Sequence, residues 1–155
     1  GTGFDVHAFE PGNKIYLCGV EIPFDRSLAG HSDADVALHA LTDAILGALA
    51  LGDIGLHFPD TDKKWEKADS MIFLNWSIKQ AKQRNLELSN IDLTIICEKP
   101  KINIFREQLV ANLSKICSLE HDKINVKATT TEGLGFTGRE EGIASICSIL
   151  LYETS

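Results

Sequence analysis

The feature that most constrains the fold is one long, mostly apolar stretch, His31 to Gly52, which reads HSDADVALHALTDAILGALALG. Apolar residues cover most of a helical wheel drawn on it, so it predicts a helix that is buried on nearly all sides. Ser32 or Asp33 would cap its N-terminus, and Gly52 would end it. The polar residues inside the helix share one narrow stripe: Asp35, His39, Thr42 and Asp43.

That polar stripe needs partners. A buried polar group without a hydrogen bond costs about 1–3 kcal/mol, and an unpaired charge costs more. A histidine that stands alone on a buried helix is usually a hydrogen-bonded core residue. Here two carboxylates and a threonine accompany His39, and other ligand-type residues lie near the N-terminus. We therefore favour a polar or metal site at His39 over a purely structural histidine.

Length and charge limit the class of protein. The 155 residues suit one domain, 1–155, with one core. The net charge of −7, with no run of Lys or Arg, argues against nucleic acid or an anionic membrane surface as partner. No stretch is long and apolar enough for a membrane span, and the first residues do not resemble a signal peptide. Scattered cysteines without a CxxC pair indicate reduced core thiols: Cys18, Cys97, Cys117 and Cys147. We expect a cytoplasmic bacterial protein, or a plastid-type one from which a targeting segment was removed.

Strands and helices alternate along the rest of the chain. Strands are predicted over Thr2–His7, Lys14–Cys18, Val20–Pro23, Ile91–Cys97, Ile124–Thr131 and Ile143–Tyr152. Helices are predicted over Ser70–Arg84, with Asp69 as N-cap, and over Phe105–Cys117. Loops are predicted over Phe24–Gly30, Leu51–Lys64, Glu98–Asn103 and Glu132–Gly142. This pattern predicts an α+β fold, in which a mixed β-sheet is layered with three main helices.

A metal site is the first chemical prediction. Asp5 and His7 point to the same side of the first predicted strand, because residues two apart in a strand share a face. With His39 they offer three nitrogen or oxygen ligands. Three protein ligands with an open fourth position are the arrangement of catalytic Zn²⁺. The D-x-H pair alone is a weak signal, and the histidine on the polar stripe strengthens it.

A phosphate site is the second prediction. The stretch from Thr129 to Arg139, TTTEGLGFTGR, combines hydroxyls, backbone amides and one arginine, which suit phosphate oxygens. Glu132 within it suits a divalent cation that bridges phosphates. The letters GLGFTG match G-x-G-x-x-G, but a β-branched strand follows, and no Lys-Ser/Thr follows the last glycine. This argues against both a Rossmann and a Walker A site. Lys99-Pro100-Lys101 is a third, weaker candidate for a phosphate or nucleotide contact.

Four stretches together resemble a known family. They are GFDVH at Gly3–His7, HSDADVALHALTDAILGA at His31–Ala48, GDIGLHFPDTD at Gly52–Asp62 and KATTTEGLGFTGREEGIA at Lys127–Ala144. In content and order they are similar to the 2-C-methyl-D-erythritol 2,4-cyclodiphosphate synthases of the non-mevalonate isoprenoid pathway. The resemblance extends from Gly3 to near the C-terminus. It is lowest at 13–25, 65–89 and 102–122.

The resemblance implies a lyase that carries out an intramolecular phosphoryl transfer. The 2-phosphate of 4-diphosphocytidyl-2-C-methyl-D-erythritol 2-phosphate would attack the β-phosphorus, CMP would leave, and the cyclic diphosphate would form. Such a transfer needs positioning and charge neutralisation more than covalent catalysis. The resemblance also implies a homotrimer with active sites between subunits. The final predicted strand has apolar residues at successive positions as well as alternate ones, so it is apolar on both faces and both need cover. A neighbouring subunit of a trimer could cover one of these faces.

The resemblance also implies roles for single residues. Asp5, His7 and His39 would hold Zn²⁺. Glu132 would hold Mg²⁺ or Mn²⁺, and His31 would act with these metal ligands in catalysis. His31 and Ser32 would contact the substrate phosphates. A flap over Phe58–Asp62 and its flank would supply the substrate contacts Asp53, Gly55, Phe58, Asp60 and Asp62. A cytidine and diphosphate pocket would be formed by Cys97, Pro100, Lys101, Ile102, Thr129, Thr130 and Thr131, and further substrate contacts would come from Phe136 and Arg139.

Two other functions stay open on the residues alone. One is a non-catalytic metal- or phosphate-binding module that keeps the metal ligands for structure. Glu132 weighs against it, because a structural zinc site is closed by four protein ligands and has no use for a second carboxylate beside a phosphate loop. The other is a metal-dependent phosphoesterase, which would release inorganic phosphate instead of a cyclic diphosphate and CMP.

Overall fold

The main sheet of the protein has five strands in the order β4-β1-β7-β5-β6. The computed structural model describes residues 1–154. In sheet order the strands are Arg26–Leu28, Thr2–Pro11, Gly142–Glu153, Leu86–Ile96 and Ile124–Thr129. Neighbouring strands are antiparallel except β5 and β6, which are parallel. A separate antiparallel hairpin joins β2 (Lys14–Leu17) to β3 (Val20–Pro23).

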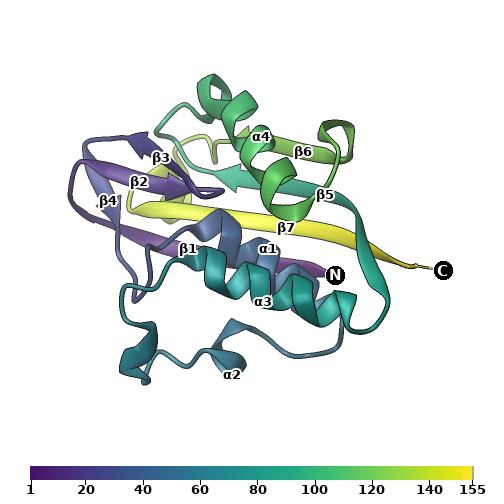
Figure 1. The fold of residues 1–155 in the computed structure, drawn as a ribbon. Coiled ribbons are helices and arrows are strands. Elements are labelled where there is room, and N and C mark those ends of the chain that lie inside the picture. Colours follow the sequence, from purple (N-terminus) through teal and green to yellow (C-terminus); the bar gives the residue numbers. More distant parts are fainter. Residues whose placement is uncertain (155) are drawn as a thin grey trace.

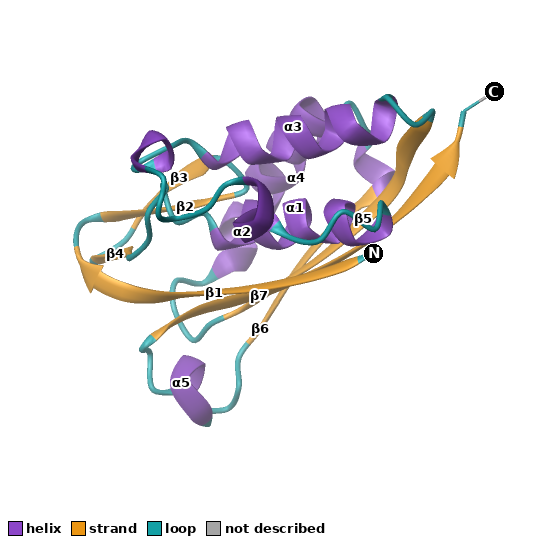
Figure 2. Cartoon of the chain, turned by 90° about the horizontal axis from the view of Figure 1, so that it is seen from below, coloured by secondary structure: helices purple, strands orange, loops and turns teal. Residues whose placement is uncertain are grey.

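Three helices cover one face of this sheet (Figures 1 and 2). They are α1 (Val36–Ala48), α3 (Ser70–Lys82) and α4 (Arg106–Cys117). The remaining helical turns are short: α2 (Ile54–His57), α5 (Gly135–Gly138), η1 (Lys63–Trp65), η2 (Ile102–Phe105) and η3 (His121–Lys123). Figure 2 shows α5 beyond the opposite face of the sheet. The predicted mixed sheet with three main helices is confirmed. Among residues 1–154, no helix has the length and apolar character that crossing a membrane requires.

Helix α1 lies at the centre of the fold, directly over β1 and β7. The glycines at the start of β1 make this close approach possible. A Cβ atom added at Gly3 would lie 2.0 Å from the carbonyl oxygen of Ala40, so no larger residue fits there. Most of α1 is buried, as its apolar circumference predicts. The positions of β1 side chains relative to α1 are therefore tightly fixed.

The predicted ends of α1 are wrong. Its N-cap is Asp35, instead of Ser32 or Asp33, and its C-cap is Leu49, three residues before Gly52. The sequence HSDAD offers several short polar side chains at the start of the helix, and local pattern does not select among them.

Asp35 is selected as the cap by the neighbouring hairpin. Its carboxylate accepts hydrogen bonds from the backbone N–H groups of Leu38, Cys18 and Gly19, at 3.0, 3.0 and 2.6 Å. Burial raises the pKa of Asp35 to about 6, although these backbone hydrogen bonds oppose the rise. Asp35 and the equally buried Thr42, whose hydroxyl donates to the Leu38 carbonyl at 2.7 Å, therefore find their partners within the fold.

The short elements were not predicted. The predicted loop 24–30 contains β4, which pairs with the end of β1. The predicted loops 51–64, 98–103 and 132–142 contain α2 with the start of η1, the start of η2, and α5. Elements of three or four residues are too short to show a hydrophobic period, so the sequence carries no such signal for them. The longer predicted strands and helices are confirmed, with ends that differ by a few residues.

The sheet face opposite the three helices is partly apolar. Along β7, Ile143, Cys147 and Ile149 point into the core, while Ile146 and Leu150 alternate with them and are exposed. Phe4 of β1 is 56% exposed beside Ile146, its partner in the sheet. The prediction that the final strand is apolar on both faces is confirmed.

Candidate metal centre and substrate cavities

Asp5, His7 and His39 meet at one point between β1 and α1. Asp5 and His7 lie on the core-facing side of β1, and His39 lies one turn into α1. Oδ2 of Asp5 is 2.9 Å from Nε2 of His7 and 3.0 Å from Nδ1 of His39. The two imidazole nitrogens are 3.1 Å apart. In residues 1–154 this is the one group of three or more His, Cys, Asp or Glu side chains whose ligand atoms are close enough to share an ion. We call these residues the metal triad.

The geometry of the metal triad fits a small tetrahedral cation. Ligands at about 2.0–2.1 Å from a tetrahedral ion lie about 3.3 Å from one another. The three separations in the triad are close to this value. Nδ1 of His7 donates to the carbonyl oxygen of Ala29 at 2.7 Å. A carbonyl can only accept, so the lone pair of a neutral His7 is on Nε2 and faces the triad.

Charge in the triad also suits a cation. Burial by itself would raise the pKa of Asp5, but hydrogen bonds and attraction from His39 and His7 lower it to about 2. Burial lowers the pKa of His7, but its hydrogen bond and attraction to Asp5 outweigh this and raise it. Asp5 is therefore an anion at neutral pH, held between two imidazoles.

The metal triad opens into a cavity of about 370 Å³, here called the triad cavity. Two triad members, His7 and His39, are part of its lining. Five of the predicted substrate contacts line it with them: His31, Ser32, Gly55, Phe58 and Asp60. Part of its wall is aromatic, since the ring of Phe58 packs against Trp65 and Phe73 at centroid distances of 4.9 and 4.7 Å. The structure therefore brings together residues from β1, α1, α3 and the segments on either side of α1.

Two predicted substrate contacts of the flap and its flank have structural contacts instead of lining the triad cavity. The carboxylate of Asp53 accepts from the backbone N–H of Leu56 at 2.9 Å, and Asp62 accepts from Lys64 at 3.0 Å. Asp43 of α1 accepts from the N–H of Ile54 at 2.8 Å and ties α2 to α1. The flap is thus a series of capped turns that is anchored to the central helix.

The predicted cytidine residues form a separate cavity of about 190 Å³, here called the loop cavity. Six of them line it, together with Glu98: Cys97, Pro100, Lys101, Ile102, Thr129 and Thr130. Thr131 stands beside this cavity, where its backbone N–H donates to Glu98 at 3.2 Å. The triad cavity and the loop cavity share no lining residue.

Most of the rest of the predicted phosphate loop is exposed and lies apart from the metal triad. Glu132 has a left-handed backbone with φ of +54°, and its side chain is exposed. Phe136 is exposed as well, and Arg139 pairs with Glu141 at 3.0 Å. These residues lie just before or within the turn that contains α5, beyond the sheet face opposite α1 and α3 (Figure 2). One chain therefore does not bring Glu132 to the triad.

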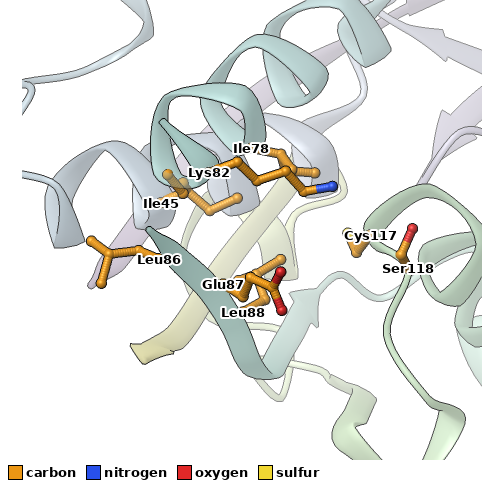
Figure 3. Close-up of a pocket in the computed structure, with 9 residues that line it drawn as sticks. Ile45, Ile78, Lys82, Leu86, Glu87, Leu88, Cys117 and Ser118 are labelled. Atoms are coloured by element: carbon orange, nitrogen blue, oxygen red, sulfur yellow. The ribbon is translucent and has the colours of Figure 1, made fainter. Parts of the chain in front are cut away.

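A third cavity, of about 240 Å³, lies between α1, α3, β5 and the end of α4 (Figure 3). Its walls are apolar side chains such as Ile45 and Ile78, with the polar ends of Lys82 and Glu87 among them. Burial raises the pKa of Cys117, which lines it, to about 12. That thiol is therefore protonated and a poor nucleophile at neutral pH.

Sequence reasoning missed two residues next to the metal triad. Oγ of Ser70 lies 2.8 Å from Nε2 of His39, and Asp33 contacts Ser70 in turn. In the sequence Ser70 is the first residue of a helix, and Asp33 is a candidate cap. The contact between Ser70 and His39 spans 31 residues, so no local pattern indicates it.

Comparison with known proteins places this geometry in a family context. The chain matches the model of the YgbB family over residues 1–152. A 2-C-methyl-D-erythritol 2,4-cyclodiphosphate synthase of Cereibacter sphaeroides is 54% identical over 153 residues, which are 99% of this chain and 96% of that protein. The bifunctional enzyme IspD/IspF of Paracoccus denitrificans is 57% identical over 99% of this chain. The chain spans only 40% of the length of that relative.

A solved structure gives the same result. The IspF of Plasmodium falciparum, in its CDP complex, superposes with a TM-score of 0.88 at 32% identity. The match covers all of this chain and 96% of the other. The fold described above is therefore that of this relative along nearly its whole length.

Proposed function

The chain belongs to the YgbB family, and from that premise we propose that it converts 4-diphosphocytidyl-2-C-methyl-D-erythritol 2-phosphate to 2-C-methyl-D-erythritol 2,4-cyclodiphosphate and CMP. This reaction is a step towards isoprenoid precursors, and residues 1–155 would form one domain for it. The observation that carries the proposal is the metal triad, which opens into a cavity lined by predicted substrate contacts. The bacterial origin of the curated relatives supports a cytoplasmic location.

The proposed reaction makes and breaks one phosphorus–oxygen bond each. An oxygen of the 2-phosphate attacks the β-phosphorus of the diphosphate. The bond from the β-phosphorus to the bridging oxygen breaks, and CMP leaves with that oxygen. The attacking phosphate is already an anion, so no strong general base is needed. Alignment and charge neutralisation are the main requirements.

The triad cavity supplies alignment and charge near the reacting phosphates. Asp5, His7 and His39 would hold one divalent cation, for which we propose Zn²⁺. When bound, such a cation supplies Lewis-acid chemistry at a phosphate oxygen. His31 and Ser32 line the same cavity and would contact the phosphates. The wall of Phe58, Trp65 and Phe73 would pack on the methylerythritol carbons and exclude water.

The loop cavity would bind the part of the substrate that leaves. A CDP ligand is named for the Plasmodium falciparum relative, and we propose the same nucleotide class here. The cytosine would enter between Cys97 and Ile102, while Lys101 and the hydroxyls of Thr129 and Thr130 would contact the diphosphate. We propose that Glu132, on the adjoining loop, holds Mg²⁺ or Mn²⁺ against these phosphates.

We also propose a homotrimer with composite active sites. Two observations support it. Exposed apolar side chains such as Phe4, Ile146 and Leu150 gather on the sheet face opposite the helices, and such a surface favours association. Glu132 and the triad also stand apart within one chain, so a loop from a neighbour would have to complete each site. A monomer mass in light scattering would contradict this assembly.

A product assay tests the activity. The protein is incubated with the cytidine substrate and Mg²⁺, and products are followed by phosphorus NMR. We expect 2-C-methyl-D-erythritol 2,4-cyclodiphosphate and CMP in equal amounts. Release of inorganic phosphate would instead support a metal-dependent phosphoesterase. Binding without turnover would support a non-catalytic module.

A further inference from the structure

A connected set of hydrogen bonds lies behind the metal triad, on the side of His39 that faces away from Asp5. The hydroxyl of Ser70 donates to Oδ1 of Asp33, and its oxygen lies 2.8 Å from Nε2 of His39. The backbone N–H of Ser70 donates to the other carboxylate oxygen of Asp33 at 3.1 Å. Ser70 is fully buried, so its hydroxyl is shielded from bulk water.

The direction of these hydrogen bonds fixes a proton on His39. A carboxylate can only accept, so the single hydroxyl proton of Ser70 points to Asp33. The hydroxyl oxygen then presents only lone pairs to His39. Nε2 of His39 must therefore carry a proton and donate it to Ser70. In a neutral imidazole this leaves the lone pair on Nδ1, the atom that faces Asp5 at 3.0 Å.

Ser32 does not replace Ser70 in this role. Its oxygen is 3.1 Å from Nε2 of His39, a longer contact than that of Ser70. It also accepts a hydrogen bond from the backbone N–H of Ala34 at 3.2 Å. The contacts of Ser32 do not set the direction of its hydroxyl proton as Asp33 sets that of Ser70. The carboxylate of Asp33 thus fixes the direction of the hydrogen bonds from His39 to Ser70 and from Ser70 to Asp33.

We propose that Ser70 and Asp33 are positioning residues that hold His39 in the tautomer and ring orientation needed to bind the metal. Because the inference concerns the triad's ligand, it rests on the metal centre of the proposed function. The segments that carry the two residues are joined through their backbones. The N–H of Asp33 donates to Ala68 at 3.1 Å, and that of Lys67 donates to His31. The segment that follows the flap is thereby connected to the metal ligand through Ser70.

The chain offers a matched control for the test. Ser77 lies on the same helix, seven residues after Ser70, and is equally buried. Its hydroxyl donates to the carbonyl oxygen of Leu74 at 2.8 Å. A Ser77→Ala variant therefore loses a buried hydroxyl from α3 without changing the contacts of His39. Ser70→Thr keeps the hydroxyl and serves as the rescue variant.

The decisive measurement is the affinity of the full chain for Zn²⁺, by competition with a chelator at fixed pH. Removal of an outer partner of a metal ligand costs roughly 10–100-fold in affinity. We expect a loss of that size in Ser70→Ala, less than about threefold in Ser77→Ala, and recovery in Ser70→Thr. With Co²⁺ as probe, we expect the visible absorption bands to shift in Ser70→Ala alone.

Three results would overturn the inference, and they can be told apart. If the unmodified chain binds Zn²⁺ and Ser70→Ala binds it equally well with an unchanged Co²⁺ spectrum, the positioning role is wrong and the metal centre stands. If the unmodified chain binds no Zn²⁺, the metal centre of the proposed function fails as well. Equal losses in Ser70→Ala and Ser77→Ala would indicate a general effect on α3, and would also contradict the role.

Discussion

The metal triad and the loop from Thr129 to Arg139 are built in opposite ways. The triad residues stand on β1 and α1, which approach each other closely at Gly3, and protein groups hold both imidazole rings. The loop follows β6, is largely exposed, and carries Glu132 in a left-handed conformation. One region is preorganised inside the chain. The other presents its polar groups outward.

This difference indicates separate roles for the two regions in the proposed reaction. A site whose ligands lie on packed elements binds its ion before substrate arrives, because little side-chain entropy remains to be lost. An exposed loop would gain its order from what it contacts, here the proposed nucleotide, cation and neighbouring chain. Metal binding and turnover should therefore be separable by mutation.

Removal of a triad ligand should give the largest effect. In Asp5→Ala and in His39→Ala we expect bound zinc to be lost and turnover to fall by more than about a hundredfold, beyond the loss caused by outer partners. The fold should survive, because the triad lies at the edge of a cavity and is only half-buried. Metal analysis, product assay and circular dichroism measure the three quantities. His121→Ala, on the exposed η3 turn, is the control. Full zinc occupancy in either triad variant would disprove the assignment.

Glu132→Gln should separate the two regions. The substitution keeps the size of the side chain and removes its charge, so zinc should stay at full occupancy. Mg²⁺-dependent turnover should fall by about tenfold or more, equivalent to about 1.4 kcal/mol of lost transition-state stabilisation. Glu107→Gln, an exposed residue on α4, is the matched control. If the dependence of the rate on Mg²⁺ is unchanged, Glu132 does not hold the second cation.

The sequence could predict those features that lie on regular helices and strands, because these elements have a repeating pattern of apolar and polar residues. The alternation of a strand places Asp5 and His7 together, and the stripe on a buried helix predicts that His39 faces a polar partner. The same periods predict the long helices and strands. The triad follows from these patterns because each ligand is on a regular element whose facing side is fixed by packing.

The parts that sequence could not predict depend on contacts between distant segments. Strand β4 exists because it pairs with the end of β1, and its three residues show no pattern of their own. Asp35 is the helix cap because a turn at Cys18 and Gly19 also needs its carboxylate. Ser70 reaches His39 only because the segment after the flap returns to α1. The local propensity of a segment carries no information about contacts with distant segments.

A mixing experiment should show whether the two regions work across subunits. Asp5→Ala damages the triad, and Thr130→Trp fills the loop cavity, which Thr130 lines. If sites form between chains of a trimer, random mixing after co-refolding pairs an intact triad with an intact loop in about a quarter of the sites. We expect about that fraction of the unmodified activity. Mixing Asp5→Ala with His39→Ala, two changes in the same half, should recover none.

The outcome of mixing would decide where the site lies. A stable trimer with no recovered activity would place each site within one chain, and the apolar sheet face would then serve assembly alone. A monomer mass would contradict both the trimer and the composite site.

The smallest effect should come from the backbone of Glu132. A left-handed conformation costs a residue with a side chain about 1–2 kcal/mol, whereas glycine adopts it freely. Glycine loses about 0.5–1 kcal/mol more chain entropy on folding, so the two effects partly cancel. Glu132→Gly should therefore be more stable than Glu132→Gln by about 0.5 kcal/mol, with the same loss of Mg²⁺-dependent turnover. Denaturant unfolding at one fixed protein concentration measures the difference. A Glu132→Gly variant that is less stable by a similar amount would show that the loop stores no strain. The expected result would mean that Glu132 is retained at a cost in stability for its carboxylate, as other strained residues are at functional sites.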